Sequence, residues 1–177
     1  MCGIVGVLGK EPVAELLVDA LKRLEYRGYD SAGVATLENG RLERRRAEGK
    51  LRNLEGLLKT HPLHGDTGIG HTRWATHGAP CDENAHPHTD DDGAFALVHN
   101  GIIENYGALR ERLKQKGVTF QSQTDTEVLV ELIADVKKTT GLSLEEAVRQ
   151  ALTQVVGTYG IAIVSGDDPD LLIAARK

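Results

Sequence analysis

Hydrophobic residues near the start of the chain fall into two kinds of spacing. The continuous run GIVGVLG at 3–9 predicts a short buried strand. Apolar side chains then recur every three or four positions until Gly28, which predicts an amphipathic helix. Asn39 and Gly40 separate two extended runs, and both residue types tolerate the positive φ of a tight hairpin turn. Residues 33–46 are therefore expected to form an antiparallel pair of strands.

The rest of the chain continues this mixture of hairpins and helices. Regularly spaced leucines predict a short helix at 51–58 and another that ends at Gly117, and TGIGHTR and AFALVHN read as strands. Two more helices are expected to begin at capping boxes, in which glutamate follows a hydroxyl residue by three positions: these are Thr124 with Glu127 and Ser143 with Glu146. The tail TYGIAIVSGDDPDLLIAARK predicts two strands joined by a turn. The stretch 77–93 is the one long loop expected.

Length and charge narrow the classes of function. The 177 residues suffice for one domain with a sizeable core. Because 21 Lys and Arg stand against 26 Asp and Glu, the formal net charge is −5 and no general attraction to nucleic acid or acidic membranes is expected. The run RLERRR at 41–46 is a local exception, and it is expected to lie along a solvated strand.

The chain shows no membrane or export signal. No stretch approaches the roughly 20 consecutive apolar residues that span a bilayer, and the N-terminus lacks the charged and apolar regions of a signal peptide. A cytoplasmic protein that does not bind membranes is therefore expected. Thiols stay reduced in that compartment, so Cys2 and Cys81 are expected to be free.

Cys2 is the first candidate for chemistry. Its small side chain suits removal of Met1, which would leave a thiol and a free α-amine on one residue. An α-amine titrates near pH ~7.7–8.0 and a thiol near ~8.5, so the amine can take the proton of the thiol. The alternative is that Cys2 is a small buried hydrophobe at the head of a strand.

A second group of polar side chains ends the predicted strand TGIGHTR. Arg73, Trp74, Thr76 and His77 bring a planar cation, a hydroxyl and an imidazole to its rim, and Arg73 could bind a small carboxylate through two hydrogen bonds. The alternatives are a surface salt bridge for Arg73 and a core aromatic for Trp74. Clustering before a loop favours a site.

Two further positions complete a set of complementary groups. Asn100 and Gly101 end another strand, where an amide side chain and a backbone N–H could face one oxyanion, although an ordinary Asn-Gly turn would look the same. Asp125 lies at a helix start that keeps a carboxylate ionised, ready for an ammonium, and plain capping is the alternative. A thiol with its own base, an oxyanion donor pair, a cation and an anion together match the needs of glutamine hydrolysis.

These residues lie in motifs that resemble a known family. The motifs are CGIVG, RLEYRGYDSAG, HTRWATHG, NAHPH, HNGIIENY and TDTEV. They resemble those of the class II glutamine amidotransferases, which have an N-terminal cysteine and belong to the Ntn-hydrolase superfamily. The resemblance runs through the whole chain, so residues 1–177 are expected to be a glutaminase domain of this type. It implies an α+β fold, a four-layer αββα sandwich with two antiparallel sheets.

The resemblance also implies catalytic roles. Cys2 would attack the γ-carboxamide of L-glutamine, and Asn100 with the Gly101 N–H would form the oxyanion hole. A γ-glutamyl thioester would result and then be hydrolysed. Arg27, in YRGYD, resembles the arginine that lies beside the catalytic cysteine.

Substrate-binding roles follow in the same way. Arg73 with Thr76 and His77 would hold the α-carboxylate of glutamine, and Asp125 would hold its α-ammonium. Trp74 would stand near the route by which ammonia leaves. The loop over the glutamine pocket would include His86, the sixth residue expected to bind substrate.

The chain departs from the family at its C-terminal end. The members whose motifs this chain resembles most closely continue past LLIAAR with further strands of the glutaminase domain and then with sugar-isomerase domains that bind fructose 6-phosphate. Because these parts are absent here, the resemblance implies a domain truncated at that end. The partners that it implies are L-glutamine and the missing domains, in a homo-oligomeric full-length protein, with no cofactor and no metal.

Two other interpretations remain open at this point. One is a zinc site, because five potential ligands lie close together in sequence: His71, His77, Cys81, His86 and His88. Their spacing fits no common structural pattern of zinc ligands. The other is a catalytically silent chain that serves as a structural or regulatory piece.

Overall fold

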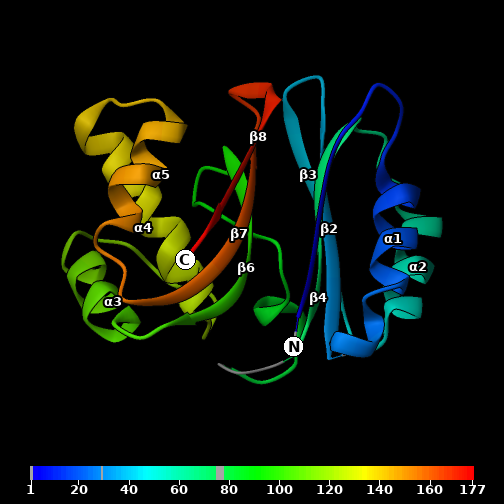
Figure 1. Ribbon diagram of the computed structural model, residues 1–177, viewed down its shortest axis with the longest axis horizontal. Coiled ribbons are helices and arrows are strands. Elements are labelled where there is room, and N and C mark those ends of the chain that lie inside the picture. The colour runs from blue at the N-terminus through cyan, green and yellow to red at the C-terminus, as the bar shows by residue number, and fades with distance from the viewer. Residues whose placement is uncertain (1, 29, 75–77) are drawn as a thin grey trace.

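Two four-stranded antiparallel sheets face each other in the centre of the molecule, and helices cover the outer face of each (Figure 1). This computed structural model describes residues 2–28, 30–74 and 78–177, and for Arg27 the backbone alone. The layers run helix, sheet, sheet, helix. The expected α+β fold, a four-layer αββα sandwich, is therefore confirmed.

The first sheet has the spatial order β1-β4-β2-β3. Its strands are β1 (Gly3–Leu8), β2 (Ser31–Glu38), β3 (Arg41–Glu48) and β4 (Thr67–Arg73). Its outer face is covered by α1 (Ala14–Lys22) and α2 (Leu51–Thr60), and the 3-10 helix η1 (Glu25–Arg27) follows α1. Leu17, Leu21 and Leu54 are fully buried in this layer, as their helical spacing predicts.

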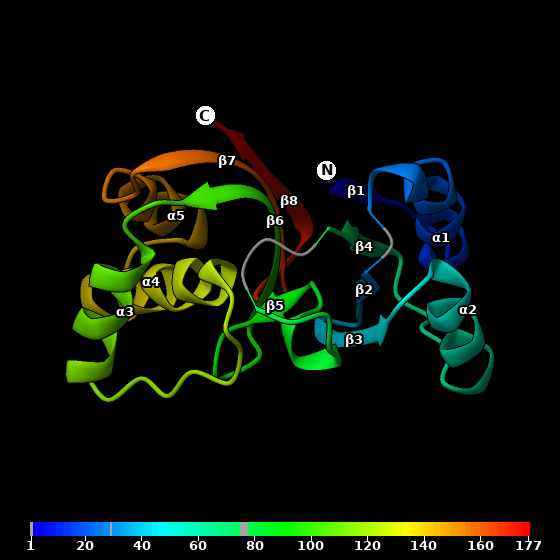
Figure 2. The ribbon, with the colours of Figure 1, turned by 90° about the horizontal axis from the view of Figure 1, so that it is seen from below.

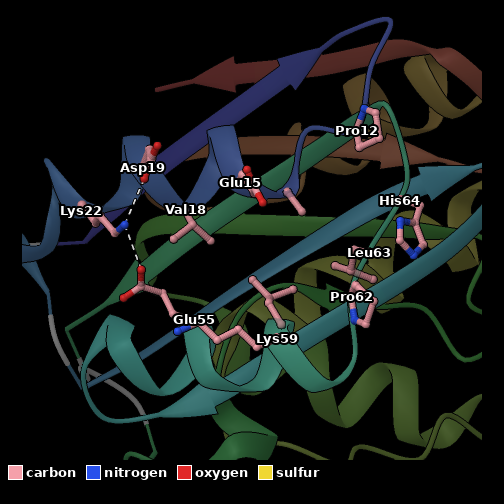
Figure 3. Close-up of a pocket in the computed structure, with 12 residues that line it drawn as sticks. Pro12, Glu15, Val18, Asp19, Lys22, Glu55, Lys59, Pro62, Leu63 and His64 are labelled. Atoms are coloured by element: carbon pink, nitrogen blue, oxygen red, sulfur yellow. Dashed lines mark hydrogen bonds and ion pairs between the residues drawn. The ribbon is translucent and has the colours of Figure 1, made fainter.

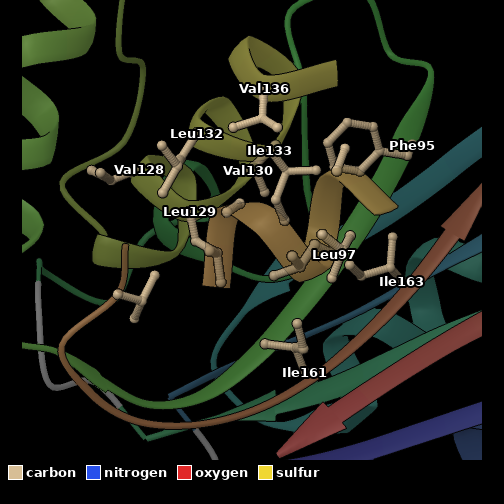
Figure 4. Packing of buried hydrophobic residues seen from close by; sticks show 14 of the residues in the cluster. Phe95, Leu97, Val128, Leu129, Val130, Leu132, Ile133, Val136, Ile161 and Ile163 are labelled. Atoms are coloured by element: carbon tan, nitrogen blue, oxygen red, sulfur yellow. The ribbon is translucent and has the colours of Figure 1, made fainter. Parts of the chain in front are cut away.

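The second sheet has the order β5-β6-β7-β8. Its strands are β5 (His88–Thr89), β6 (Phe95–Ile103), β7 (Gly157–Ser165) and β8 (Asp168–Arg176). It carries the larger helical layer, made of α3 (Tyr106–Gln115), α4 (Asp125–Thr140) and α5 (Leu144–Leu152). Figure 4 shows how Leu129 and Ile133 of α4 pack on Phe95, Leu97 and Ile163 of the sheet. None of the helices in the described part of the chain has the length and apolar character that crossing a bilayer requires.

The hairpin and both capped helices begin where the sequence predicts. Asn39 (φ 51°) and Gly40 (φ 75°) form the turn between β2 and β3. Ser143 and Glu146 make the complete capping box of α5. At α4 only half of the box forms, because the Thr124 hydroxyl accepts the N–H of residue 127 while that glutamate's carboxylate binds other backbone groups.

The basic run at 41–46 corrects one prediction. Arg44 and Arg46 of β3 are not solvated but half-buried, and their guanidinium groups donate to the backbone carbonyls of the loop opposite: Arg44 to Pro87 (3.3 Å) and Arg46 to Ala85 (2.9 Å). Arg45 points to the other face of the sheet and donates to the carbonyl of His61 (3.0 Å). Because successive side chains of a strand point to opposite faces, Arg44 and Arg46 both point inward.

The loop at 77–93 also contains more structure than predicted. A 3-10 helix, η2 (Asp82–Asn84), and the short strand β5 lie within its described part. Asn84 holds this segment in place, because its side-chain amide donates to the carbonyl of Ala79 (2.9 Å) and its Oδ1 accepts from the backbone N–H of Gln123 (2.9 Å). The loop therefore closes one edge of the sandwich.

The layer between the two sheets changes character along its length. At one end it is apolar, with Ile69 of β4 and Val98 of β6 fully buried. At the other end the inward positions carry His71 and Asn100. Figure 2 looks at the molecule from the side of the N-terminus, where β1 and β4 of one sheet lie opposite β6 and β8 of the other. The candidate residues gather at this polar end.

Candidate active site

Cys2 lies at the head of β1, beside the end of β4. Antiparallel pairing places Gly3 opposite Thr72, so the thiol comes next to the backbone that follows Arg73. The backbone N–H of Trp74 donates to Cys2 Sγ at 3.1 Å, and the sulfur lies 3.6 Å from the Trp74 carbonyl oxygen. The side chain is half-buried rather than sealed in the core. The Trp74 N–H is therefore in position to stabilise a thiolate at Cys2.

Asn100 reaches Cys2 from the second sheet. Its side-chain Nδ2 donates to the Cys2 carbonyl oxygen at 3.2 Å, although 98 positions separate the two residues. A cavity of about 350 Å³ opens between the two sheets at this place, with Leu24, Gly160 and Ala175 among the residues of its wall. Cys2, the expected nucleophile, and Asn100, the expected oxyanion donor, are therefore in contact.

Gly101 follows Asn100 in a conformation that requires glycine. Its φ is +128°, and a Cβ built there would lie 2.1 Å from the Thr158 carbonyl oxygen. No other residue fits this backbone without strain. The glycine thus keeps the chain close to β7. The expectation that Asn100 and Gly101 end the strand is wrong, because β6 continues to Ile103 and Gly101 pairs with Tyr159.

Burial raises the pKa of the Cys2 thiol. The hydrogen bond from Trp74 and the nearby charge of Arg73 oppose this shift only in part. The thiol is therefore protonated near neutral pH. Chemistry at this sulfur needs a base.

Arg73 is almost wholly buried, with 4% of its surface exposed. Its guanidinium donates to the carbonyls of Gly78 (3.4 Å) and Ala79 (3.3 Å), which follow it in the chain. Burial lowers the pKa of Arg73, although the neighbouring Cys2 and the carboxylate of Asp125 act in the opposite direction. The side chain of Trp74 is 45% exposed. Thr76 and His77 lie outside the described residues, as does the side chain of Arg27.

All four side chains of the motif TDTE at the start of α4 make contacts. The Thr124 hydroxyl lies 3.2 Å from His88 Nε2, and the Thr126 hydroxyl lies 3.0 Å from His99 Nδ1. Asp125 accepts the backbone N–H of Ile103 through Oδ2 at 2.9 Å. The carboxylate of residue 127 accepts the N–H groups of residues 121 and 122 at 2.8 and 2.6 Å. Each side chain thus ties the helix start to another segment, and Asp125 is fixed beside the end of β6.

Four histidines are buried at the polar end of the sandwich: His71, His86, His88 and His99. The rings of His71 and His86 stack with centroids 4.1 Å apart, and His88 meets His86 edge-on at 4.9 Å. Burial lowers the pKa of the first three well below the usual value, to about 3 for His71. These rings are neutral at physiological pH.

This placement changes the interpretation of His86. It also adds two residues that the sequence analysis did not assign to the glutaminase site, His71 and His99, of which His71 was considered only as a zinc ligand. His86 is only 4% exposed and lies behind His71, so its described contacts are with other histidines rather than with the cavity beside Cys2. His71 and His99 contact Asn100 and Thr126 directly. Their positions in the sequence were a signal, because His71 begins the motif HTRWATHG and His99 begins the motif HNGIIENY.

The described histidines give no support to a zinc site. One ring nitrogen of His71 and one of His86 are directed to protein groups: His71 Nε2 lies 2.8 Å from Asn100 Oδ1, and His86 Nδ1 accepts from the N–H of His99 (3.4 Å). Among residues 2–28, 30–74 and 78–177, no group of three or more His, Cys, Asp or Glu is arranged to hold a metal ion. Zinc needs several ligand atoms that converge on one point.

A second cavity lies on the other side of the first sheet. It has a volume of about 640 Å³ and runs between α1 and α2, over Val18 and Leu63 (Figure 3). Its rim is charged, and Lys22 joins Asp19 (3.0 Å) to Glu55 (2.9 Å) across it. Because the sheet separates this groove from Cys2, the two sites do not share residues.

A family model and the sequences of known proteins both relate this chain to glutamine-dependent enzymes. A family model described as a glutamine amidotransferase domain matches residues 71–177. The chain is 59% identical over 177 residues to the glutamine–fructose-6-phosphate aminotransferase [isomerizing] of Bradyrhizobium diazoefficiens and 58% identical to that of Agrobacterium fabrum. Both matches cover 100% of this chain and 29% of the relative. The chain thus spans less than a third of the length of these curated relatives.

The fold has counterparts among solved structures. The glutamine phosphoribosylpyrophosphate amidotransferase from B. subtilis, in complex with ADP and GMP, superposes with a TM-score of 0.84 at 26% sequence identity. The superposition covers 100% of this chain and 37% of that one. The sandwich described above is therefore similar to the corresponding part of a longer enzyme.

Proposed function

Because the chain belongs to the glutamine amidotransferase domain family, we propose that it hydrolyses L-glutamine to glutamate and ammonia, with Cys2 as the nucleophile. The observation that carries the proposal is the meeting of Cys2 and Asn100, which come from different sheets and are joined by a hydrogen bond of 3.2 Å. This bond places an amide donor next to the residue that carries the thiol, which suits attack on a carboxamide followed by stabilisation of the oxyanion.

The first step needs a base, since burial keeps the thiol protonated. In the proposed mechanism Met1 is removed, and the α-amine of Cys2 takes the proton of its own thiol. An amine with a pKa of ~7.7–8.0 is partly deprotonated near neutral pH and can do so. The Trp74 N–H, 3.1 Å from the sulfur, stabilises the thiolate that forms.

The thiolate then attacks the γ-carboxamide carbon of glutamine. The carbonyl π electrons move to oxygen, and this oxyanion accepts hydrogen bonds from Asn100 Nδ2 and the Gly101 N–H. The protonated amine of Cys2 gives its proton to the leaving nitrogen, so ammonia departs and a γ-glutamyl thioester remains. Water, deprotonated by the same amine, attacks the thioester and releases glutamate and the thiol.

Substrate is bound at its α-carbon groups. The proposal assigns the α-carboxylate to the buried Arg73, which supplies the cation, and to Thr76 and His77. Asp125 uses Oδ2 for the backbone of Ile103, and the proposal assigns Oδ1 to the α-ammonium. The two charges are carried by different elements, β4 and α4, which sets the length of the pocket between them.

Three further residues keep supporting roles in the proposal. The proposal assigns Arg27, the last residue of η1, a place beside the nucleophile, and it assigns Trp74, which contacts Cys2, to the route for ammonia. The buried position of His86 suits an indirect role, in which its ring supports His71 from behind.

In the longer protein we propose that the ammonia is used for synthesis. The relatives of highest identity are named glutamine–fructose-6-phosphate aminotransferase, and this chain spans 29% of their length. Sugar-isomerase domains outside this chain would bind fructose 6-phosphate and use the ammonia to form glucosamine 6-phosphate. The proposal includes a homo-oligomeric, cytoplasmic enzyme.

A glutaminase assay tests the first part of the proposal. Release of glutamate and ammonia from L-glutamine is expected from the purified protein, and Cys2→Ala should abolish it. Cys81→Ser is the matched control, since it removes the other free cysteine and should leave the rate unchanged. The glutamine-analogue electrophile 6-diazo-5-oxo-norleucine should form one adduct, on Cys2. A folded protein with Met1 removed that neither releases glutamate nor takes the label would favour the catalytically silent alternative.

A further inference from the structure

The oxyanion hole in the proposed mechanism depends on which way a side-chain amide points. An asparagine amide carries an acceptor, Oδ1, and a donor, Nδ2, and rotation by half a turn exchanges them. Only the orientation with Nδ2 toward the reacting carbonyl would stabilise an oxyanion. Some neighbouring group must therefore select the orientation of Asn100.

His71 is in position to make that selection. It lies on β4, is fully buried, and its Nε2 is 2.8 Å from Asn100 Oδ1. The same Nε2 is 3.1 Å from the backbone carbonyl oxygen of His99. A carbonyl oxygen only accepts hydrogen bonds, so Nε2 must carry the proton. The amide atom that faces it must then be the acceptor.

The other side of Asn100 leads to the same orientation. Its second amide atom lies 3.2 Å from the Cys2 carbonyl oxygen, which also only accepts, so that atom must be Nδ2. The carbonyl oxygens at the two ends of this series of hydrogen bonds therefore require the same orientation of the Asn100 amide. The order is Cys2 carbonyl, Asn100 amide, His71 ring, His99 carbonyl.

The His71 ring is itself held. It stacks on His86 with centroids 4.1 Å apart and planes inclined by 30°. Burial, the charge of Arg73 and the nearby His99 disfavour the imidazolium and lower the pKa of His71 to about 3. Among the described residues Nδ1 has no hydrogen-bond partner, which fits a neutral ring with its one proton on Nε2.

We propose that His71 is a positioning residue for the oxyanion hole: through Nε2–H it holds Asn100 with Nδ2 turned toward the carbonyl that Cys2 attacks. This inference rests on the proposed glutaminase function. A histidine buried only for packing would occupy the same space, so the test must separate orientation of the amide from stability of the fold.

The first variant is His71→Phe, which keeps an aromatic ring and removes the donor. The expected result is a fall in kcat of roughly 10- to 10³-fold, up to the loss expected for one oxyanion donor, with KM changed less than about threefold. In an Asn100→Ala background the same substitution should lower kcat by less than about threefold, because the amide that it orients is gone. Equal losses of kcat in both backgrounds would overturn the proposal.

His71→Gln is the rescue variant, since an amide N–H can occupy a place similar to Nε2–H. It should recover most of the kcat lost in His71→Phe. Ile69→Ala, on the same strand and the same inward face, controls for stability and should leave the kcat of the folded protein unchanged. A folded His71→Gln protein that is no more active than His71→Phe would contradict the positioning role.

A measurement on the wild-type protein covers the case in which His71→Phe does not fold. Nitrogen-detected NMR of the imidazole should report a proton on Nε2 and none on Nδ1 of His71 between pH 5 and 9. The opposite tautomer, or titration in that range, would overturn the proposal. A wild-type protein that releases no glutamate would refute the glutaminase function itself, whereas an active wild type with unaffected variants would refute the positioning role alone.

Discussion

Between the two sheets, β4 and β6 pass from an apolar end to a polar end within two residues. Ile69 and Val98 fill the apolar end, and the next inward positions on the same strands are His71 and Asn100. The apolar contacts are not directional and hold the sheets at a fixed separation. At that separation Asn100 reaches Cys2 across the gap.

The two ends should respond differently to substitution. Loss of an apolar side chain should cost stability and leave the turnover of the folded protein intact. Loss of a polar side chain at the other end should cost turnover or affinity while most of the stability remains. Each of the following variants tests one side of this contrast.

Ile69→Ala should produce the largest effect, on stability. The residue is fully buried between the sheets, and truncation leaves a cavity as well as losing apolar burial. A loss of about 2–5 kcal/mol in the free energy of unfolding is expected, measured by urea denaturation. The kcat of the protein that remains folded should stay within a few-fold of wild type. A large fall in kcat at unchanged stability would reverse the roles of the two ends.

Asn100→Ala should produce the complementary effect, on turnover. Removal of one oxyanion donor is expected to lower the kcat of glutamine hydrolysis by roughly 10²–10³-fold, or about 3–4 kcal/mol of transition-state stabilisation. Asn105→Ala is the matched control, because that asparagine bonds the carbonyl of Gln154 (2.8 Å) and accepts from Val156 (3.0 Å) away from Cys2. The control should lose stability without this loss of kcat, and similar kcat values in both variants would contradict the role of Asn100.

Arg73→Ala should affect affinity more than turnover. A charge-assisted hydrogen bond contributes about 1.5–3 kcal/mol, so a rise in KM for glutamine of roughly 10- to 100-fold is expected. Binding of the α-carboxylate is similar in ground and transition states, so kcat should fall less than KM rises. Arg45→Ala removes an arginine that also donates to a backbone carbonyl, on the outer face, and serves as the control. A fall in kcat with unchanged KM would assign Arg73 a different role.

Thr124→Ala should have the smallest effect. It removes the hydroxyl that caps α4 and contacts His88, at an expected cost of about 0.5–2 kcal/mol in stability. Because Asp125 follows directly, KM for glutamine should also rise, by a few-fold. Ser143→Ala removes the equivalent cap of α5, far from the site, and should lower stability alone. Equal KM values in the two variants would mean that the cap does not position Asp125.

The sequence was sufficient to predict the elements themselves. The strand at 67–73, the Asn39-Gly40 turn and both capped helix starts follow from local spacing and turn chemistry, and the structure has them where predicted. These features depend on residues close together in the chain. For the same reason the apolar faces of the helices could be identified in advance.

Features that depend on distant contacts could not be predicted from local patterns. Alternation along 41–46 shows that Arg44 and Arg46 share a face but not that this face is turned inward, toward the loop at 83–87. His71 lies 29 positions from its partner Asn100, and no local pattern indicates that contact. The capping box at Thr124 forms only in part for a local reason, because the carboxylate of Glu127 accepts from the backbone N–H groups of residues 121 and 122 instead. The resemblance supplied the fold where local spacing could not.

The central claim is that Cys2 forms a covalent bond to the γ-carbonyl of glutamine, and acid quenching during turnover tests it most directly. The protein is mixed with L-glutamine, quenched at low pH and digested, and the N-terminal peptide is analysed by mass spectrometry. The account predicts a peptide that begins at Cys2 and carries one γ-glutamyl group in thioester linkage, accumulating within the first turnovers. Glutamine hydrolysis by a protein that retains Met1, or a γ-glutamyl group on any other residue, would contradict it.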